Sequence, residues 1–258
     1  MRLPFNELRW LKRAASDSNR SLESLIQRRL NHEPLQYIIG TQPFGALDNL
    51  RVRPPVLIPR PETENWVIRL AEYLCSSSSS RNISLLDLGT GSGCIPLLLC
   101  HLCPKVVATG VDISPHAVRL ANENAELCGI PHSRFKAFLG DFVHPGFPKT
   151  EAINPPYDIL TSNPPYITPD EYLRLSDDVA KFEDPTALIG GYDGLEFYRA
   201  ITSLVARPGF LSHKAMVALE VGHSQADAVC DMLSPTGFRI SVWTDPWGKK
   251  RTVIAQRQ

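Results

Sequence analysis

The sequence predicts an α/β protein with a mostly parallel sheet that carries helices on both faces, preceded by a small helical segment. Strand-like and helix-like stretches alternate from Leu85 onward, which is typical of parallel sheets. Residues 1–45 are instead rich in helix formers. The last two strand-like stretches, residues 238–243 and 251–255, are close enough in sequence to pair antiparallel.

The N-terminal region has the apolar spacing of two amphipathic helices. Their apolar faces run along Leu8, Leu11 and Ala15, and along Leu22, Leu25, Ile26 and Leu30. Arg51 to Pro61 is proline-rich and should be extended up to a helix that begins near Glu62. A serine run at residues 76–80 predicts a surface connection. We therefore divide the chain into a helical domain (1–45), a connection (46–64) and a main domain (65–258).

A glycine loop follows the first strand of the main domain, residues 83–88. The dinucleotide pattern G-x-G-x-x-G would need glycine at position 94, where this chain has cysteine. The acid and glycines at alternate positions instead resemble motif I of S-adenosylmethionine-dependent methyltransferases. This cofactor has no phosphate, so the loop must allow close backbone approach. An ordinary turn between strand and helix is the alternative. The predicted cofactor contacts here are Asp87, Gly89, Thr90, Gly91, Ser92 and Gly93.

Two later strand ends supply further candidate cofactor contacts. Residues 106–111 end at Asp112, near the ~20-residue spacing at which an acid binds ribose hydroxyls in this class of fold. Residues 134–139 lead into Asp141 and Phe142. In the methyltransferase fold this loop usually meets the adenine, so Asp141 would accept from its amine and Phe142 would lie against the ring. A surface turn with a core phenylalanine is the alternative.

The strongest candidate for catalysis is Asn163-Pro164-Pro165-Tyr166, which ends an apolar run at residues 157–162. Ligands bind beyond the carboxyl ends of strands in such sheets. The Asn163 side-chain oxygen and the Pro164 carbonyl are two acceptors that suit a planar –NH2 group, and Tyr166 could stack on it. We predict Asn163, Pro164 and Tyr166 as catalytic, all four residues as substrate-binding, and Asn163 also as a cofactor contact.

The same tetrapeptide occurs at Asn154-Pro155-Pro156-Tyr157. The residues before it, 145–151, carry turn formers and no strand pattern. A catalytic asparagine must project from a rigid strand end. We therefore predict that Asn154 lies in a loop and has no catalytic role.

Composition narrows the function classes. The chain has 258 residues and a formal net charge of zero. The absence of an excess of basic residues argues against direct nucleic-acid binding. No apolar run approaches the ~18 residues of a membrane span. The six cysteines show no framework spacing, and Cys100 and Cys103 are expected to be buried helix cysteines in a reducing compartment. We predict no metal site.

Four further segments resemble one family, the release-factor glutamine methyltransferases of the HemK/PrmC type. They are Arg28-Arg29 with residues 33–40, the L-I-P-R-P-E-T-E of residues 57–64, the F-E-D-P-T-A-L of residues 182–188, and the D-G-L of residues 193–195. Three features depart from the family pattern. The proline after Phe182-Glu183 comes one residue late, Phe142 replaces a common tryptophan, and the N-terminal domain keeps roughly the last two of about five helices.

The resemblance implies a seven-stranded Rossmann-like sheet and N5-methylation of a glutamine side chain. The substrate would be the Gly-Gly-Gln motif of a class I peptide-chain release factor, docked on the N-terminal domain. Two alternatives stay open: methylation of a nucleic-acid exocyclic amine (adenine N6 or guanine N2), or cofactor binding without catalysis in an assembly factor.

The resemblance and the basic residues before position 21 together suggest a mitochondrial location. Arg2, Arg9, Lys12, Arg13 and Arg20 outnumber the two acids in that segment, and transit peptides are basic and poor in acids. A cytoplasmic location, with the segment serving as a docking helix, is the alternative.

Overall fold

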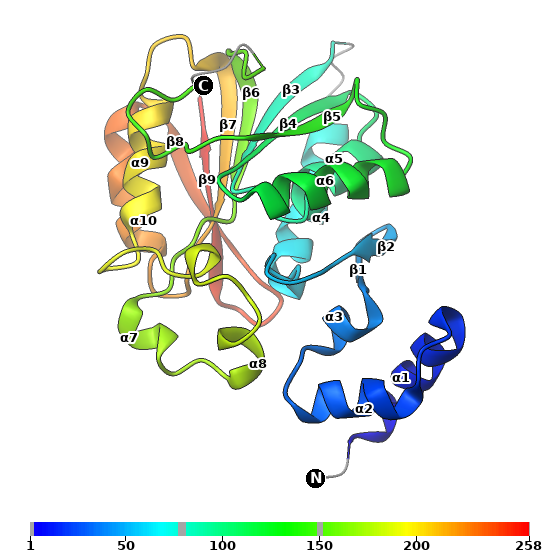
Figure 1. Cartoon of the computed structure of the whole chain (residues 1–258). Coiled ribbons are helices and arrows are strands. Elements are labelled where there is room, and N and C mark those ends of the chain that lie inside the picture. Colours follow the sequence, from blue (N-terminus) through cyan, green and yellow to red (C-terminus); the bar gives the residue numbers. More distant parts are fainter. Residues whose placement is uncertain (1–2, 77–80, 149–151, 258) are drawn as a thin grey trace.

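The computed structural model describes residues 3–76, 81–148 and 152–257. A small N-terminal body of three helices lies beside a larger α/β body (Figure 1). Most of the serine run, residues 77–80, falls outside the described residues. Within the described ranges no helix is long and apolar enough to cross a membrane.

The N-terminal body comprises α1 (Phe5–Ser18), α2 (Leu22–Leu30) and α3 (Leu35–Ile39). The two predicted amphipathic helices are confirmed, and Leu11 and Leu25 are buried in a cluster of their own with Ile38 of α3. The side chain of Ser21 caps α2 by accepting from the Ser24 amide. The short α3 was not predicted, because five residues give too few turns for a recognisable period.

A hairpin that the sequence did not reveal follows α3. Its strands are β1 (Thr41–Phe44) and β2 (Leu47–Arg51), paired antiparallel with a register shift. Pro43 made β1 hard to recognise in the sequence, because proline occurs in sheets only on edge strands, at strand starts and at bulges. Asn124 of the main domain holds the hairpin: its side chain accepts from the Arg51 amide (2.8 Å) and donates to the Arg51 carbonyl (3.0 Å).

The main sheet has seven strands in the order β5-β4-β3-β6-β7-β9-β8. The first five in this order are parallel, and β9 is antiparallel to both of its neighbours. The predicted fold class and the antiparallel final pair are therefore confirmed. The strands are β3 (Ile83–Leu88), β4 (Val106–Asp112), β5 (Phe135–Leu139), β6 (Tyr157–Ser162), β7 (Leu211–Glu220), β8 (Arg239–Thr244) and β9 (Lys250–Gln256).

Helices cover both faces of this sheet (Figure 1). On one face lie α4 (Pro61–Cys75), α5 (Cys94–Leu102) and α6 (Pro115–Leu127), and on the other α9 (Glu196–Val205) and α10 (Ala226–Leu233). Side chains of a strand alternate between the faces, so Leu85 belongs to the first core and Leu86 to the second. The short α7 (Pro169–Tyr172) and α8 (Asp177–Ala180) lie in the connection after β6.

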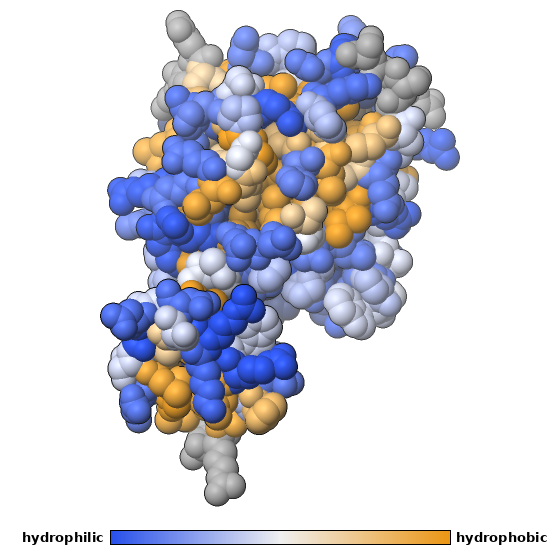
Figure 2. All heavy atoms as spheres, turned by 90° about the vertical axis from the view of Figure 1, so that its right-hand side faces the viewer, coloured by the Kyte–Doolittle hydropathy of each residue, from blue (hydrophilic) through white to orange (hydrophobic). Residues whose placement is uncertain are grey.

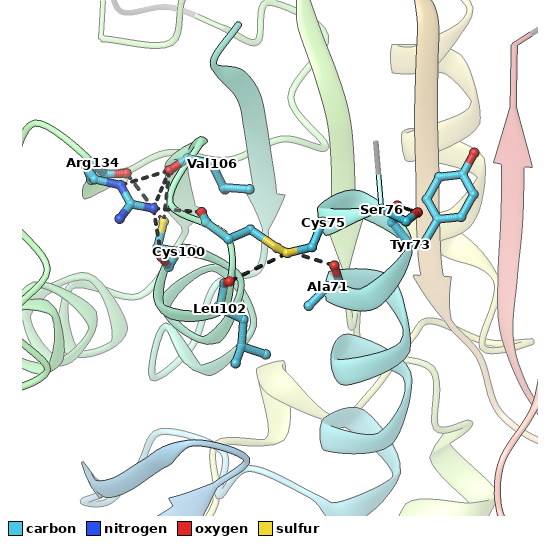
Figure 3. The surroundings of a disulfide bond; sticks show 9 residues. Ala71, Tyr73, Cys75, Ser76, Cys100, Leu102, Val106 and Arg134 are labelled. Carbon is cyan, nitrogen blue, oxygen red and sulfur yellow. Dashed lines mark hydrogen bonds between the residues drawn. A yellow bond between two sulfur atoms is a disulfide. The ribbon is translucent and has the colours of Figure 1, made fainter. Parts of the chain in front are cut away.

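A disulfide between Cys75 and Cys103 joins the ends of α4 and α5 (Figure 3). Their Cα atoms are 5.9 Å apart. The expectation that Cys103 is an unpaired helix cysteine is wrong, whereas Cys100 is unpaired and fully buried within α5. The partner of Cys103 is 28 residues away in sequence, and nothing in that spacing reveals that two helices pack side by side. The position of Cys103 beyond the last turn of α5 lets it face α4.

Cleaving this disulfide should lower stability. Closing a loop of this length restricts the unfolded chain, so Cys75→Ser should cost about 2–4 kcal/mol of unfolding free energy. The loss is expected toward the lower end, because Ala71 O lies 3.3 Å from Cys103 Sγ and could accept from a free thiol. Urea unfolding with and without reductant tests this: the wild type should become less stable with reductant and Cys75→Ser should not respond. Equal midpoints for all four samples would contradict it.

Candidate active site

The candidate site lies where the loops after β3 and β6 meet. These neighbouring strands are in register, with Leu88 opposite Ser162. The glycine loop and Asn163 therefore leave the sheet side by side. Since β4 lies on one side of β3 and β6 on the other, the chain changes direction across the sheet at this point. Such a switch point is where open α/β sheets bind ligands.

The glycine loop is shaped for close approach of a ligand. Gly89 (φ +67°) and Gly91 (φ +55°) have left-handed backbones, and a Cβ added at either would meet no atom within 4 Å. Their missing side chains leave open space beside the backbone. At Gly93 (φ +81°) close packing requires a glycine, because a Cβ there would lie 3.0 Å from Leu97 Cδ1 and 3.2 Å from Ala121 Cβ. The first two glycines thus form a cradle, and the third lets α5 pack closely.

Asp112 ends β4 beside this cradle and is almost fully buried. Its Oδ2 accepts from the Gly91 amide (2.8 Å) and its Oδ1 accepts from the Ser114 amide (2.9 Å). Burial raises the pKa of this carboxyl, while the two amide donors oppose the rise. Each oxygen keeps a further lone pair, so the pair of oxygens could accept from two neighbouring hydroxyls.

One pocket brings many of the predicted site residues together. Its wall contains Gly89, Gly91, Asp112, Asp141, Phe142, Asn163 and Pro165. The sequence did not point to Phe197 of α9, which also lines the pocket and packs against Phe142 with ring centroids 5.8 Å apart. The glycine cradle, the carboxylate at a strand end and the paired aromatic rings fit S-adenosylmethionine. Within the described residues no group of three or more His, Cys, Asp or Glu could hold a metal ion.

The remaining predicted residues lie outside that wall. Thr90, Ser92, Gly93, Pro164 and Tyr166 do not line it, so the substrate contacts expected of Pro164 and Tyr166 stay predictions. Asp141 lines the pocket, but its Oδ1 also accepts from the Val143 amide (2.9 Å), so its role toward adenine stays a prediction.

Asp87 lies beneath the glycine loop and is fully buried. Its Oδ1 accepts from Thr161 Oγ1 at 2.7 Å. Burial raises the pKa of this carboxyl to about 7, although the Thr161 hydrogen bond opposes the rise. Its contact with cofactor stays a prediction.

Asn163 is held by a hydrogen-bonded group that the sequence did not reveal. Its Nδ2 lies 3.2 Å from Thr63 Oγ1 of α4. Thr63 donates in turn to Glu220 Oε2 at the end of β7 (2.7 Å), which also accepts from Trp66 Nε1 (2.9 Å). Thr63 belongs to the L-I-P-R-P-E-T-E segment, so that segment was a usable signal. Its side chain contributes to the site from a hundred residues away in sequence.

Two glycines of the loop before α9 lie against the backbone after Asn163. A Cβ at Gly190 would lie 2.5 Å from the Pro165 carbonyl oxygen, and one at Gly194 would collide with the Tyr166 carbonyl oxygen. Gln225 Nε2 donates to that same Tyr166 oxygen (3.0 Å). The D-G-L of residues 193–195 therefore contributes close backbone packing around the tetrapeptide. Burial raises the pKa of the Tyr166 phenol to about 12, so it is neutral at ordinary pH.

An ion pair joins two of the sequence segments that carried the resemblance. Arg60 Nη2 donates to both carboxylate oxygens of Glu183, at 2.8 and 2.6 Å. Glu183 is buried, which raises its pKa, and Arg60 opposes that rise. The Asp184 amide also donates to the Pro55 carbonyl (2.9 Å). The proline-rich connection is thereby fixed against the segment that follows α8.

The second tetrapeptide lies at the opposite end of β6. Asn154 is exposed and lies in the loop before Tyr157, the first residue of the strand. The prediction of a loop is confirmed. Asn154 is absent from the pocket wall that Asn163 lines.

Comparisons with known proteins show which family the chain resembles. Residues 79–222 match the family model "Methyltransferase domain", and residues 8–40 match "PrmC N-terminal domain". The chain is 39% identical to a release factor glutamine methyltransferase of Thermodesulfovibrio yellowstonii, over 94% of this chain and 83% of that protein. It is 40% identical to one of Geobacter sulfurreducens, over 83% of this chain and 69% of that protein.

Solved structures support the fold. A methyltransferase from Pyrococcus furiosus superposes with a TM-score of 0.54 at 15% identity, covering 81% of this chain and 88% of that one. The human methyltransferase 10 domain containing protein gives the same TM-score at 18% identity, again covering 81% of this chain and 88% of that one.

We expect Asp112→Ala to weaken cofactor binding. Loss of a charged acceptor for two hydroxyls costs on the order of 1.5–3 kcal/mol, or roughly 10- to 150-fold in Kd. Asp112→Asn is the matched control, since it keeps one acceptor oxygen and should lose less. Titration calorimetry with S-adenosylmethionine measures both values, and an unchanged Kd for Asp112→Ala would refute this role.

Asp87 should make stability fall as pH rises. With a folded pKa of about 7 against an ordinary value of 3.8, the folded state keeps a proton that the unfolded chain has released between these values. The free energy of unfolding therefore declines through this range and levels off above about pH 7. Asp87→Asn keeps an acceptor for Thr161 without the charge, so without cofactor it should exceed the wild type by on the order of 2–4 kcal/mol at pH 8.

Urea unfolding at pH 4 and pH 8 checks the effect of Asp87→Asn. The difference between variant and wild type should be small at pH 4, where both carry a neutral group. A difference that does not change with pH would show that Asp87 is not the titrating group.

Proposed function

The chain belongs to the release factor glutamine methyltransferase family, and we propose that it methylates a glutamine side chain of a release factor. The reaction would be N5-methylation with S-adenosylmethionine as methyl donor. The acceptor would be the glutamine of the Gly-Gly-Gln motif in a class I peptide-chain release factor. The methyltransferase domain match and the names of the relatives support this proposal.

The observation that carries the proposal is the shared pocket. Asn163, at the carboxyl end of β6, lines the same pocket as the glycine cradle and Asp112. An amide captured at Asn163 would therefore lie beside a cofactor held by the cradle. When bound, S-adenosylmethionine supplies a methyl group made electrophilic by its sulfonium.

The residues of the chain would act by orienting the amide. A glutamine amide nitrogen is a poor nucleophile, because its lone pair is delocalised into the carbonyl. The Asn163 Oδ1 and the Pro164 carbonyl would accept its two N–H groups and fix the direction of the nitrogen. Proline has a fixed φ and carries no N–H, which makes the Pro164 carbonyl a rigid acceptor. Such positioning lowers a barrier by several kcal/mol without a strong base.

We propose that the N-terminal body contributes to docking of the release factor. Phe5 and Trp10 of α1 are 79% and 45% exposed, and both belong to the same helix. Figure 2 shows hydrophobic side chains gathered on the lower part of this body. Aromatic residues are enriched at protein interfaces. The zero net charge of the chain favours a protein substrate over a nucleic acid bound through its phosphates.

The mitochondrial location stays a prediction. The basic residues that suggest it include Arg9, Lys12 and Arg13 on α1, a helix whose buried face packs in the N-terminal body. The same basic residues also fit the alternative, a cytoplasmic protein in which this segment is a docking helix. A fluorescent fusion distinguishes a mitochondrial from a cytosolic location, and a purely cytosolic signal would reject the prediction.

A transfer assay tests the function itself. Purified protein and cofactor carrying a labelled methyl group are incubated with a class I release factor, with that factor carrying Gly-Gly-Ala, and with total RNA and DNA. Label in the first sample only is the expected result. Label in nucleic acid would point to the exocyclic-amine alternative, and label nowhere, with cofactor bound, to a non-catalytic protein.

The two tetrapeptides give a matched pair of variants. Asn163→Ala should lower kcat by a factor of about 10² or more, because it removes an acceptor that orients the nucleophile. Its cofactor Kd should stay within severalfold. Asn154→Ala should leave kcat unchanged and shift stability by less than about 0.5 kcal/mol, as for most exposed positions. If Asn154→Ala lowered kcat and Asn163→Ala did not, the active site would lie at the amino end of β6, against this proposal.

A further inference from the structure

A continuous set of hydrogen bonds runs from the end of β7 to the catalytic asparagine. Glu220 is 1% exposed and Thr63 is 2% exposed. The Thr63 Oγ1 lies 2.7 Å from Glu220 Oε2 and 3.2 Å from Asn163 Nδ2. Trp66, one turn further along α4, donates its indole N–H to the same Glu220 oxygen at 2.9 Å.

The chemistry of these groups determines which way the Asn163 amide faces. A carboxylate only accepts hydrogen bonds, and the Thr63 hydroxyl has a single proton. That proton goes to Glu220, so Thr63 presents lone pairs to Asn163. The amide nitrogen of Asn163 must then face Thr63. A flipped amide would bring two acceptor oxygens together and lose a hydrogen bond.

We propose that Thr63 and Glu220 are positioning residues, which together hold the Asn163 amide with its Oδ1 available to the substrate nitrogen. This inference rests on the proposed function of Asn163. Without the Thr63 hydroxyl, the amide could rotate and present its –NH2 group, a donor, to a substrate –NH2 group that needs acceptors. Trp66 acts one step further back, because its N–H holds the Glu220 oxygen in place.

Burial and hydrogen bonding act on Glu220 in opposite directions. Burial raises the pKa of Glu220, and the hydrogen bonds from Thr63 and Trp66 oppose the rise. Thr63 lies in the first turn of α4, where the helix dipole favours a negative charge. A buried carboxylate is costly unless its hydrogen bonds are made. The position of Glu220 directly behind Asn163 therefore fits a role in hydrogen bonding to the site better than a role in packing alone.

Thr63→Val tests the proposal with little change of volume. The variant should lower kcat on the order of tenfold, the effect of one lost hydrogen bond. Cofactor Kd and the KM for the release factor should change less than twofold. Thr63→Ser restores the hydroxyl and should recover most of the activity. Thr202→Val is the matched control, since that threonine on α9 is half-buried and its buried hydroxyl has no hydrogen-bond partner among the described residues.

A double-mutant cycle separates positioning from general structural damage. If Thr63 acts through Asn163, Thr63→Val should have no further effect on the residual single-turnover rate of Asn163→Ala. Wild-type kcat in Thr63→Val, or an equal loss in both backgrounds, would overturn the inference while leaving the role of Asn163 intact. Wild-type turnover in Asn163→Ala itself would instead overturn the proposed function.

A second pair of variants tests Glu220. Glu220→Gln keeps an acceptor oxygen for Thr63 and Trp66 and should retain kcat within about threefold. Glu220→Leu removes the acceptor, frees the Thr63 proton and should lower kcat on the order of tenfold, as in Thr63→Val. Thermal unfolding confirms that both variants are folded at the assay temperature. Equal kcat in Gln and Leu variants, both folded, would exclude Glu220 from positioning.

Discussion

The site depends on the register of two parallel strands. Leu88 of β3 lies opposite Ser162 of β6, so the glycine loop and Asn163 start from the same level of the sheet. Every residue of β6 is buried, with apolar or hydrogen-bonded side chains on both faces. A shift by one residue would turn all of these side chains to the wrong face. The distance between the glycine cradle and the Asn163 amide is therefore set by the packing of the whole sheet.

Segments far from β6 in sequence then immobilise what leaves it. Thr63 and Glu220 hold the Asn163 side chain, while Gly190 and Gly194 allow the loop before α9 to lie directly against the following backbone. The Arg60–Glu183 ion pair fixes the connection that leads into α4. This arrangement explains why conspicuous sequence segments outside the glycine loop belong to the same site. A catalytic group must be placed to within about half an ångström, which one strand end cannot guarantee alone.

The sequence predicted local features well and side-chain partnerships poorly. β3 and β6 lie at the predicted residues, because each contains a short apolar stretch and its end is marked by a glycine or proline that follows. Phe197, Thr63 and Glu220 were missed, since each reaches the site from a helix or strand whose pattern reports only on its own burial. The Cys75–Cys103 disulfide and the β1–β2 hairpin were missed for a related reason: both depend on which elements become neighbours in space.

The two copies of Asn-Pro-Pro-Tyr show why a motif needs its structural setting. They lie at opposite ends of the same strand, so the same four residue types face different surroundings. At the carboxyl end of β6 the chain meets the glycine cradle, Asp112 and the hydrogen bond from Asn163 to Thr63. At the amino end of β6, Asn154 is exposed in a loop and is not part of the pocket wall that contains those groups. Ligands bind at the end of a parallel strand at which its neighbours also end, and only there does the tetrapeptide have the setting that the proposed catalytic role requires.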